Sequence, residues 1–278
     1  MKFKTVMKKI LCTLAALVVI PLMLPAQASA EHITPQTMVT TDATDLWWNP
    51  NESGWGLQVN QSGNLLFVTI FIYRGDGSPL WVTAQLTSVG NSSFTGNVFL
   101  SSGPYFGAPV FNPALVTTVP VGTMTFTFTS IVTATITYSI SGVVVTKNIQ
   151  RQPLLLEPVS GTYTGSANIT ASSCTNPANN TAGNFGYTLA LNQVGAAING
   201  SFQLAGAGQC AFSGTYTEFG RMGTYATNYV CPNGETGLMN FIEVTNRIGI
   251  ISGRLSGQST TLGCAYSGRF AVVNPLVP

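Results

Sequence analysis

Trp47-Trp48-Asn49-Pro50-Asn51-Glu52-Ser53-Gly54-Trp55-Gly56 is the densest aromatic stretch of the chain, with three of its four tryptophans, one carboxylate and two glycines. Directly after it, Leu57 and Val59 alternate with polar residues, which is the period-two pattern of a half-buried β-strand. Trp55 shares the face of Leu57 and Val59, so we interpret it as a core residue. The stretch therefore predicts the entry into a small β-barrel.

Short alternating runs separated by turn residues continue from this stretch to Gln152, and none of them shows a helical period. After the strand at 55–60, the pattern predicts strands at 65–73, 80–86, 94–100, 123–128, 134–140 and 143–152. Tight turns join most of them, and residues 101–113 form a Gly- and Pro-rich excursion. Runs at this spacing predict an all-β antiparallel meander that closes into a barrel, with a two-layer β-sandwich as the alternative.

The last of these strands places two cations, Lys147 and Arg151, on the same face as its inward-pointing valines. A cation inside a barrel needs a partner, because its desolvation is otherwise uncompensated. The first and last strands of a closed barrel are neighbours, and Glu52 lies at the start of the first strand. We therefore expect Glu52, Lys147 and Arg151 to form a structural ion pair.

A second region repeats itself: Cys210-Ala-Phe-Ser-Gly is echoed by Cys264-Ala-Tyr-Ser-Gly, and Gly-Thr-Tyr precedes both Cys174 and Cys231. The pattern predicts eight strands near 160–173, 183–193, 196–204, 209–217, 221–230, 236–244, 247–256 and 263–272. This is a second antiparallel meander, four strands per half.

Four of the five cysteines lie in this second region, an even number that indicates two disulfides in an oxidising compartment. If the eight strands run up and down, all four cysteines meet at one rim. Closure then favours Cys210–Cys231 and Cys174–Cys264, because strands four and five are neighbours and so are strands eight and one. Pairing within halves, Cys174–Cys210 and Cys231–Cys264, respects the repeat equally well and stays open.

The first thirty residues have the features of a secretory signal peptide: four lysines, an apolar run from Ile10 to Leu24, and Ala28-Ser29-Ala30 as cleavage site. A membrane anchor is the alternative, but the run is short and interrupted by prolines. We expect a secreted or periplasmic protein, cleaved after Ala30, with no membrane span after cleavage. The predicted organisation is a flexible arm at 31–44, one β domain at 45–156 and a disulfide-stapled β domain at 157–278.

Removal of the signal peptide changes the charge balance, since it takes four of the eleven basic residues and none of the nine acidic ones. The exported chain has a formal net charge of −2 and no basic stripe. Nucleic acid is therefore not an expected partner.

The sequence offers little catalytic chemistry. The single histidine, His32, lies in the arm, which excludes a histidine-based triad and a multi-histidine metal site. The cysteines form no CxxC pair, so we expect no metal and no cofactor. A paired-carboxylate glycosidase is the enzymatic alternative, with Glu52, Asp76, Glu218, Glu235 and Glu243 as its candidates. Their scatter over two domains leads us to expect no enzyme activity and no catalytic residue.

Aromatic side chains near loops are the candidate ligand-binding residues, because planar rings stack on sugars and apolar molecules. They are Trp47, Trp48, Trp81, Tyr105 and Phe106. The strand at 65–73 is apolar on both faces, and we expect its Leu66, Val68, Ile70 and Ile72 face to be a covered outer surface.

Two resemblances add to these expectations. A Trp near the start of the first strand and an Arg on the last resemble the packing signature of lipocalin-like calycin barrels, with Ser-Gly-Trp-Gly in place of Gly-x-Trp. The motif Trp-Trp-Asn-Pro-x-Glu-Ser-Gly-Trp-Gly, with the later Gly-Pro-x-Phe-Gly and Lys-x-Ile-x-Arg-Gln, resembles a module of many secreted proteobacterial proteins. That resemblance covers residues 45–155 and implies export, a Gram-negative source and the domain boundary, but no activity.

The sequence thus predicts a non-enzymatic exported binding module whose ligand is a glycan or a small apolar molecule. A structural or protein-interaction module of the cell surface is the alternative. An outer-membrane barrel is disfavoured, since no set of strands shows a continuous lipid-facing band. The oligomeric state is left open.

Overall fold

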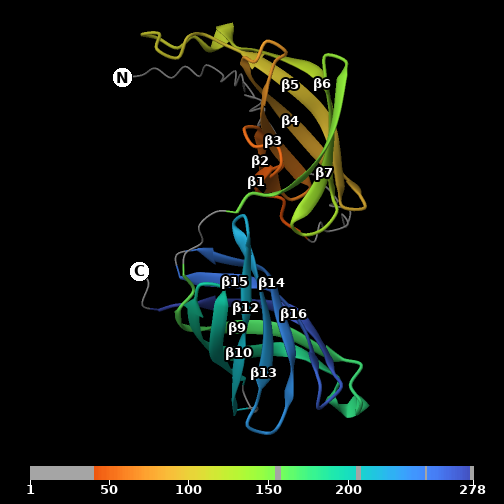
Figure 1. The fold of residues 1–278 in the computed structure, drawn as a ribbon, viewed down its shortest axis with the longest axis vertical. Coiled ribbons are helices and arrows are strands. Elements are labelled where there is room, and N and C mark those ends of the chain that lie inside the picture. Colours follow the sequence, from red (N-terminus) through yellow and green to blue (C-terminus); the bar gives the residue numbers. More distant parts are fainter. Residues whose placement is uncertain (1–40, 154–157, 205–207, 248, 276–278) are drawn as a thin grey trace, which may run out of the picture. The chain divides into compact units, whose positions relative to one another are not determined.

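The computed structural model describes residues 41–153, 158–204, 208–247 and 249–275 (Figure 1). The predicted signal peptide, its cleavage site and residues 31–40 of the predicted arm lie outside these ranges. Within the described residues, no helix is long and apolar enough to cross a bilayer.

The first barrel contains eight antiparallel strands. They are β1 (Asp45–Trp48), β2 (Gly56–Ser62), β3 (Leu65–Tyr73), β4 (Pro79–Gly90), β5 (Ser93–Ser102), β6 (Thr117–Phe128), β7 (Thr133–Ile140) and β8 (Val143–Arg151). A short 3₁₀ helix, η1 (Pro113–Leu115), lies between β5 and β6. Each strand pairs with the next and β1 pairs with β8, so the meander is closed. A closed barrel, and not a sandwich, is confirmed.

β1 was not among the predicted strands, and it is the element that closes the barrel. Trp47 lies opposite Arg151 and Trp48 opposite Gln150, while the other edge of β1 pairs with β2. Four residues are too few to display an alternating pattern next to an irregular segment, which is why sequence reasoning placed the first strand at Trp55.

The end of the predicted flexible arm is held against the barrel. Ala43 is fully buried; its N–H donates to Gln61 Oε1 at 2.7 Å, and its carbonyl accepts from Trp47 Nε1 at 2.9 Å. Residues 41–44 are therefore part of the barrel, because they supply hydrogen-bond partners to its core.

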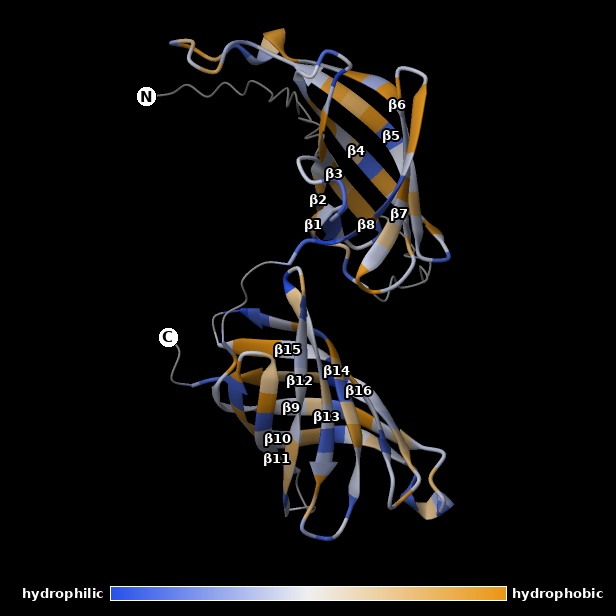
Figure 2. Ribbon diagram, in the orientation of Figure 1, coloured by the Kyte–Doolittle hydropathy of each residue, from blue (hydrophilic) through white to orange (hydrophobic). Residues whose placement is uncertain are grey.

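Hydropathy alternates along the strands of the first barrel, as the sequence pattern requires (Figure 2). The even-numbered residues of β3 are the interior ones: Leu66, Val68 and Ile70 are fully buried. The expectation that this face is a covered outer surface was therefore wrong. The outer face of β3 carries Leu65, Phe67 and Phe71, and these are 41–52% exposed. Both faces are apolar, so pattern alone could not say which of them points inward.

The second barrel contains β9 (Gly161–Ser172), β10 (Thr181–Val194), β11 (Ala197–Leu204), β12 (Gly208–Phe219), β13 (Met222–Val230), β14 (Thr236–Arg247), β15 (Ile250–Ser259) and β16 (Ala265–Val273), with η2 (Pro177–Asn179) before β10. All eight predicted strands are present, and β16 pairs with β9 to close the meander. Two small interior voids, of about 40 and 20 Å³, adjoin its core residues.

Both disulfides lie at one end of the second barrel, where β9 and β13 finish and β12 and β16 begin. Cys174 is bonded to Cys264 and Cys210 to Cys231, the pairing that the up-and-down strand order favours. The first bond spans the β9–β16 seam and the second joins β12 to β13.

Candidate ligand-binding cavity

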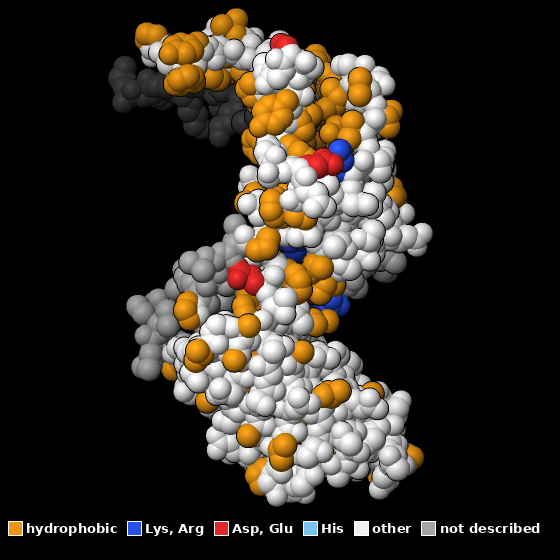
Figure 3. Space-filling view, viewed as in Figure 1, with side chains coloured by type: hydrophobic (Ala, Val, Ile, Leu, Met, Phe, Trp, Pro, Cys, Tyr) orange, Lys and Arg blue, Asp and Glu red, His pale blue; other side chains and the backbone are white. Residues whose placement is uncertain are grey.

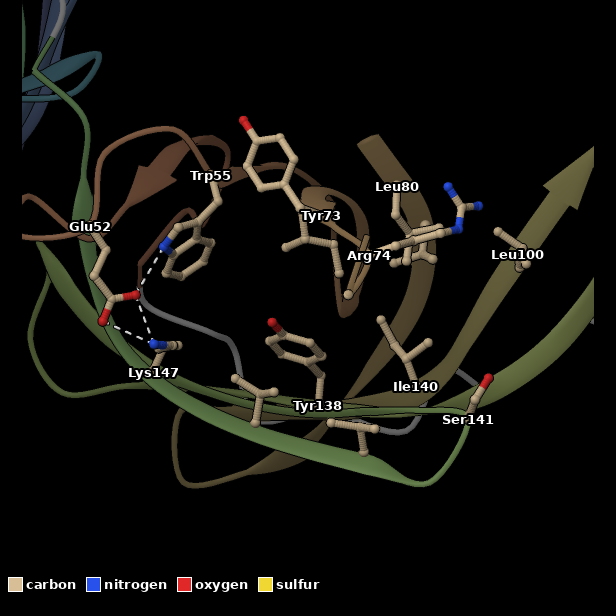
Figure 4. A pocket seen from close by; sticks show the side chains of 15 residues that line it. Glu52, Trp55, Tyr73, Arg74, Leu80, Leu100, Tyr138, Ile140, Ser141 and Lys147 are labelled. Carbon is tan, nitrogen blue, oxygen red and sulfur yellow. Dashed lines mark hydrogen bonds and ion pairs between the residues drawn. The ribbon is translucent and has the colours of Figure 1, made fainter. Parts of the chain in front are cut away.

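The first barrel holds a cavity of about 820 Å³ that opens at one end (Figure 4). The opening lies at the end where the β3–β4 and β7–β8 turns meet, since Arg74, Gly75 and Ser141 are among its lining residues. A volume of this size falls within the range of small-molecule sites, and an eight-stranded barrel is just wide enough for either packed side chains or one small ligand.

The closed end of the barrel is filled by aromatic rings. Trp47 packs edge-on against Phe126 and Phe128, with ring centroids 5.1 and 5.9 Å away, and Phe94 is fully buried as well. At the open end, the inward positions carry mainly aliphatic side chains, and the cavity lies among them. The cavity therefore results from where the large and small residues fall along the same strands.

The cavity wall is mostly apolar. Trp55, Ile72, Leu80, Val82, Leu100, Ile140, Val143 and Val145 line it. Tyr138 points its hydroxyl into the space between the walls (Figure 4). Burial raises the pKa of Tyr138 above its ordinary value, so the phenol stays protonated and is available as a hydrogen-bond donor.

The ion pair between Glu52 and Lys147 lies in one wall of the cavity (Figure 4). Lys147 Nζ donates to both carboxylate oxygens, at 2.9 Å and 2.7 Å, and Trp55 Nε1 donates to Oε2 at 3.1 Å. The hydrogen bond from Lys147, helped by that from Trp55 and opposed by partial desolvation, holds the pKa of Glu52 below its ordinary value. Both side chains are about one-third exposed, so solvent screens the pair.

The position of this ion pair follows from the shortness of β1. The β1–β8 ladder stops at the Trp48–Gln150 pair, although β8 continues for seven residues towards the opening. Glu52, in the connection between β1 and β2, reaches Lys147 on the part of β8 that pairs with β7 but not with β1. The ion pair therefore bridges the seam where β1 no longer does.

Arg151 does not join this ion pair, contrary to expectation. Its Nη1 donates to Asp45 Oδ2 at 2.9 Å with both side chains 1% exposed, and its Nε donates to the Ile131 carbonyl at 2.9 Å. Arg151 lies directly opposite β1, four residues further along β8 than Lys147. It therefore pairs with Asp45, which is on β1. Sequence reasoning missed Asp45 because β1 was not recognised as a strand.

The guanidinium of Arg151 also lies 4.7 Å from the ring centroid of Trp47. A tryptophan of the first strand against an arginine of the last is the arrangement that the calycin resemblance implies. The tryptophan is Trp47, however, and not Trp55.

None of the five predicted ligand-binding aromatics lines the cavity. Trp47 is fully buried in the floor, and Trp48 is half-buried on β1. Trp81 is 51% exposed on the outer face of β4, opposite Phe71. Tyr105 and Phe106 are exposed on the β5–β6 connection with their rings 4.8 Å apart. The aromatic lining residues are Trp55, Tyr73 and Tyr138.

Sequence reasoning missed most of the lining residues, including Tyr138, Leu80, Leu100 and Ile140. A signal was present, because each occupies an inward position within a few residues of a turn at the same barrel end. To predict the lining residues from that signal, the strand directions and the closed topology must be known, because they fix the position of each residue along the barrel axis.

The other candidate carboxylates are not among the residues that line the cavity. Asp76 is in the β3–β4 turn, where it accepts a hydrogen bond from the Ser78 N–H at 2.9 Å. In the second barrel, Glu235 accepts from Tyr229 and Tyr266, and Glu243 pairs with Arg254 at 2.7 Å. Glu218 is near the end of β12. In the described part of the chain, no three His, Cys, Asp or Glu side chains gather as a metal site would require.

No family model and no curated protein matches the chain. The resemblance of residues 45–155 to the secreted proteobacterial module thus has no counterpart in these comparisons.

Among solved structures, a protein of unknown function from the DUF3598 family of Nostoc punctiforme is 9% identical with a TM-score of 0.27, over 84% of this chain and 94% of that one. Transferrin Binding Protein B of Haemophilus parasuis is also 9% identical with a TM-score of 0.27, over 79% of this chain and 52% of that one, so this chain spans about half its length. The two closed eight-strand meanders define the fold.

Proposed function

We propose that this protein is a non-enzymatic, exported binding module whose first barrel holds a small, mainly apolar molecule. The observation that carries the proposal is the 820 Å³ cavity, open at one end and walled mostly by aliphatic and aromatic side chains. The two disulfides support export, because such bonds persist in the periplasm and outside the cell.

The polar groups of the wall favour an uncharged ligand with one hydrogen-bond acceptor. Glu52 and Lys147 neutralise each other, and Arg74 Nη1 donates to the Pro79 carbonyl at 2.7 Å. Tyr138 can donate to a ligand inside the cavity, since its hydroxyl has no hydrogen bond of its own among the described residues, and Ser141 adds a second hydroxyl at the opening. A glycan has less support, since its many hydroxyls would face an apolar wall.

The absence of enzyme activity is part of this proposal. A glycosidase needs two carboxyl groups on either side of one bond. Glu52 is engaged by Lys147 in the first barrel, while Glu235 and Glu243 are engaged by tyrosines and an arginine in the second.

Titration with N-phenyl-1-naphthylamine, an uncharged apolar fluorophore, tests the proposal. We expect saturable binding with enhanced probe fluorescence and energy transfer from the tryptophans of the first barrel, of which Trp55 lines the cavity. Val145→Trp fills the cavity and should abolish both signals. Val144→Trp is the matched control, because Val144 is the next residue on β8 and is 67% exposed on the outer face. Equal binding by the two variants, or no saturable binding by the wild type, would contradict the proposal.

A cell-surface protein-interaction module is the second candidate, favoured by the exposed apolar face of β3. Leu65, Phe67 and Phe71 point outward there, 41–52% exposed. A chain that binds no probe and sediments as an oligomer, which Phe67→Ser returns to monomer, would favour this function over the first.

A further inference from the structure

The connection between β5 and β6, residues 103–116, exposes an unusual amount of apolar surface for a loop. Tyr105, Phe106, Val110, Phe111, Leu115 and Val116 are between 44% and 91% exposed. Figure 3 shows hydrophobic side chains gathered over this segment, which leaves the first barrel as the yellow strand connection of Figure 1. Exposed apolar groups in such density mark an interaction surface.

The segment lies at the open end of the barrel. Leu100, which lines the cavity, is two residues before the end of β5, and Leu100 lies opposite Val119 on β6. The segment is also locally ordered: the Ala108 N–H donates to the Tyr105 carbonyl at 3.1 Å, and Asn112 caps η1. Its apolar side chains are thus presented by defined turns.

Other elements around the same opening expose apolar side chains too. Phe71 and Trp81 face outward as a direct cross-strand pair near the β3–β4 turn, 52% and 51% exposed. Val143 and Val144, which follow the β7–β8 turn, are 65% and 67% exposed. The apolar side chains therefore surround the opening instead of forming a groove on one side.

The charged residues at the open end of the first barrel indicate what kind of surface would bind there. No charged residue occurs between Asp76 and Lys147, so the segment and most of the rim can leave water without desolvating a charge. The charges that remain at the opening balance, with Glu52 against Lys147 and Arg74 beside Asp76. A net charge of zero gives no attraction to an anionic surface.

We propose that the open end of the first barrel docks on a phospholipid bilayer, with the apolar side chains of residues 103–116 inserted at the level of the headgroups. A bilayer is fluid and planar, so it can cover a ring of side chains around an opening, and aromatic rings are favoured at the membrane–water interface. Docking would turn the cavity opening towards the lipid. It does not depend on the cavity holding a ligand.

Flotation with vesicles of zwitterionic phosphatidylcholine tests the inference. The chain is used from Glu31 onward, because the apolar run of the predicted signal peptide would itself bind lipid. We expect co-flotation that 0.5 M salt leaves unchanged, since apolar burial and not charge drives it. Phe106→Ser with Phe111→Ser should lower the partition coefficient by about tenfold or more.

Leu65→Ser with Val89→Ser is the control pair, because both residues are exposed at the other end of the same barrel, 42% and 61%. This pair should float like the wild type. Equal flotation of the Phe106/Phe111 variant, binding only to anionic vesicles with loss in salt, or a dimer that depends on Phe106 and Phe111 would overturn the inference. The naphthylamine titration of the loop variant stays unchanged if it folds, so failure of docking and failure of the cavity proposal are told apart.

Discussion

At the scale of single residues, the two cations of β8 have opposite roles although they share one face of one strand. Arg151 is fully buried, pairs with Asp45 and lies over Trp47. Lys147 is one-third exposed and pairs with Glu52. Removing one partner of a buried pair leaves the other charge desolvated and uncompensated, whereas a solvated pair loses little.

We therefore expect Arg151→Met to lower the free energy of unfolding of the first barrel by about 3–5 kcal/mol. Lys147→Met is the matched control and should have a much smaller effect. Urea unfolding followed by tryptophan fluorescence measures both, since all four tryptophans are in the first barrel. Equal effects of the two substitutions would contradict the assignment of Arg151 and Asp45 as the closing pair.

At the scale of elements, the β1–β2 connection is the least supported part of the cavity wall. The backbone ladder between β1 and β8 covers two residue pairs, and Glu52 bridges the seam beyond it. Protonation of Glu52 would break this bridge without touching the Arg151–Asp45 pair. The connection, with Trp55 at its end, should then move independently of the barrel floor.

The pH dependence follows from the lowered pKa of Glu52. A carboxyl whose pKa is depressed on folding stabilises the fold above its ordinary value of 4.5, and this stabilisation is lost as pH falls through the folded value. We expect the tryptophan fluorescence, through Trp55, to be constant from neutral pH down to about 4.5 and to change below it. Glu52→Gln should remove the transition; its persistence in that variant would assign it to another group.

At the scale of the whole molecule, the two barrels share one plan but close differently. An aromatic residue of the first strand donates to the carbonyl four residues earlier in each case: Trp47 to Ala43 at 2.9 Å and Tyr163 to Val159 at 3.1 Å. Tyr163 is thus the counterpart of Trp47 in the second barrel. The first barrel uses ion pairs across its seam, whereas the second uses the Cys174–Cys264 disulfide.

Because the disulfides are confined to the second barrel, its stability should be sensitive to their loss and that of the first barrel should not. Loop-closure entropy predicts a loss of about 4.6 kcal/mol for Cys174→Ser with Cys264→Ser and about 3.3 kcal/mol for Cys210→Ser with Cys231→Ser, from sequence separations of 90 and 21.

Circular dichroism would follow both barrels in these variants and tryptophan fluorescence the first barrel alone. A shift of the tryptophan transition in a cysteine variant would show that the two barrels do not unfold independently, and would contradict this expectation.

The pattern of residues along the sequence determined most of the secondary structure of this protein. Period-two alternation and turn residues predicted an all-β chain and fifteen of the sixteen strands in the described residues, because these depend on neighbours in sequence. The up-and-down strand order favoured the observed disulfide pairing over pairing within halves. The tertiary structure alone decided which residues meet across the first barrel. Asp45, and not Glu52, reaches Arg151, Trp47 fills the floor, and Tyr138 and Leu80 line a cavity. These outcomes depend on how far along the barrel axis each residue lies once β1 closes the seam, and a four-residue strand leaves almost no trace of that in the sequence.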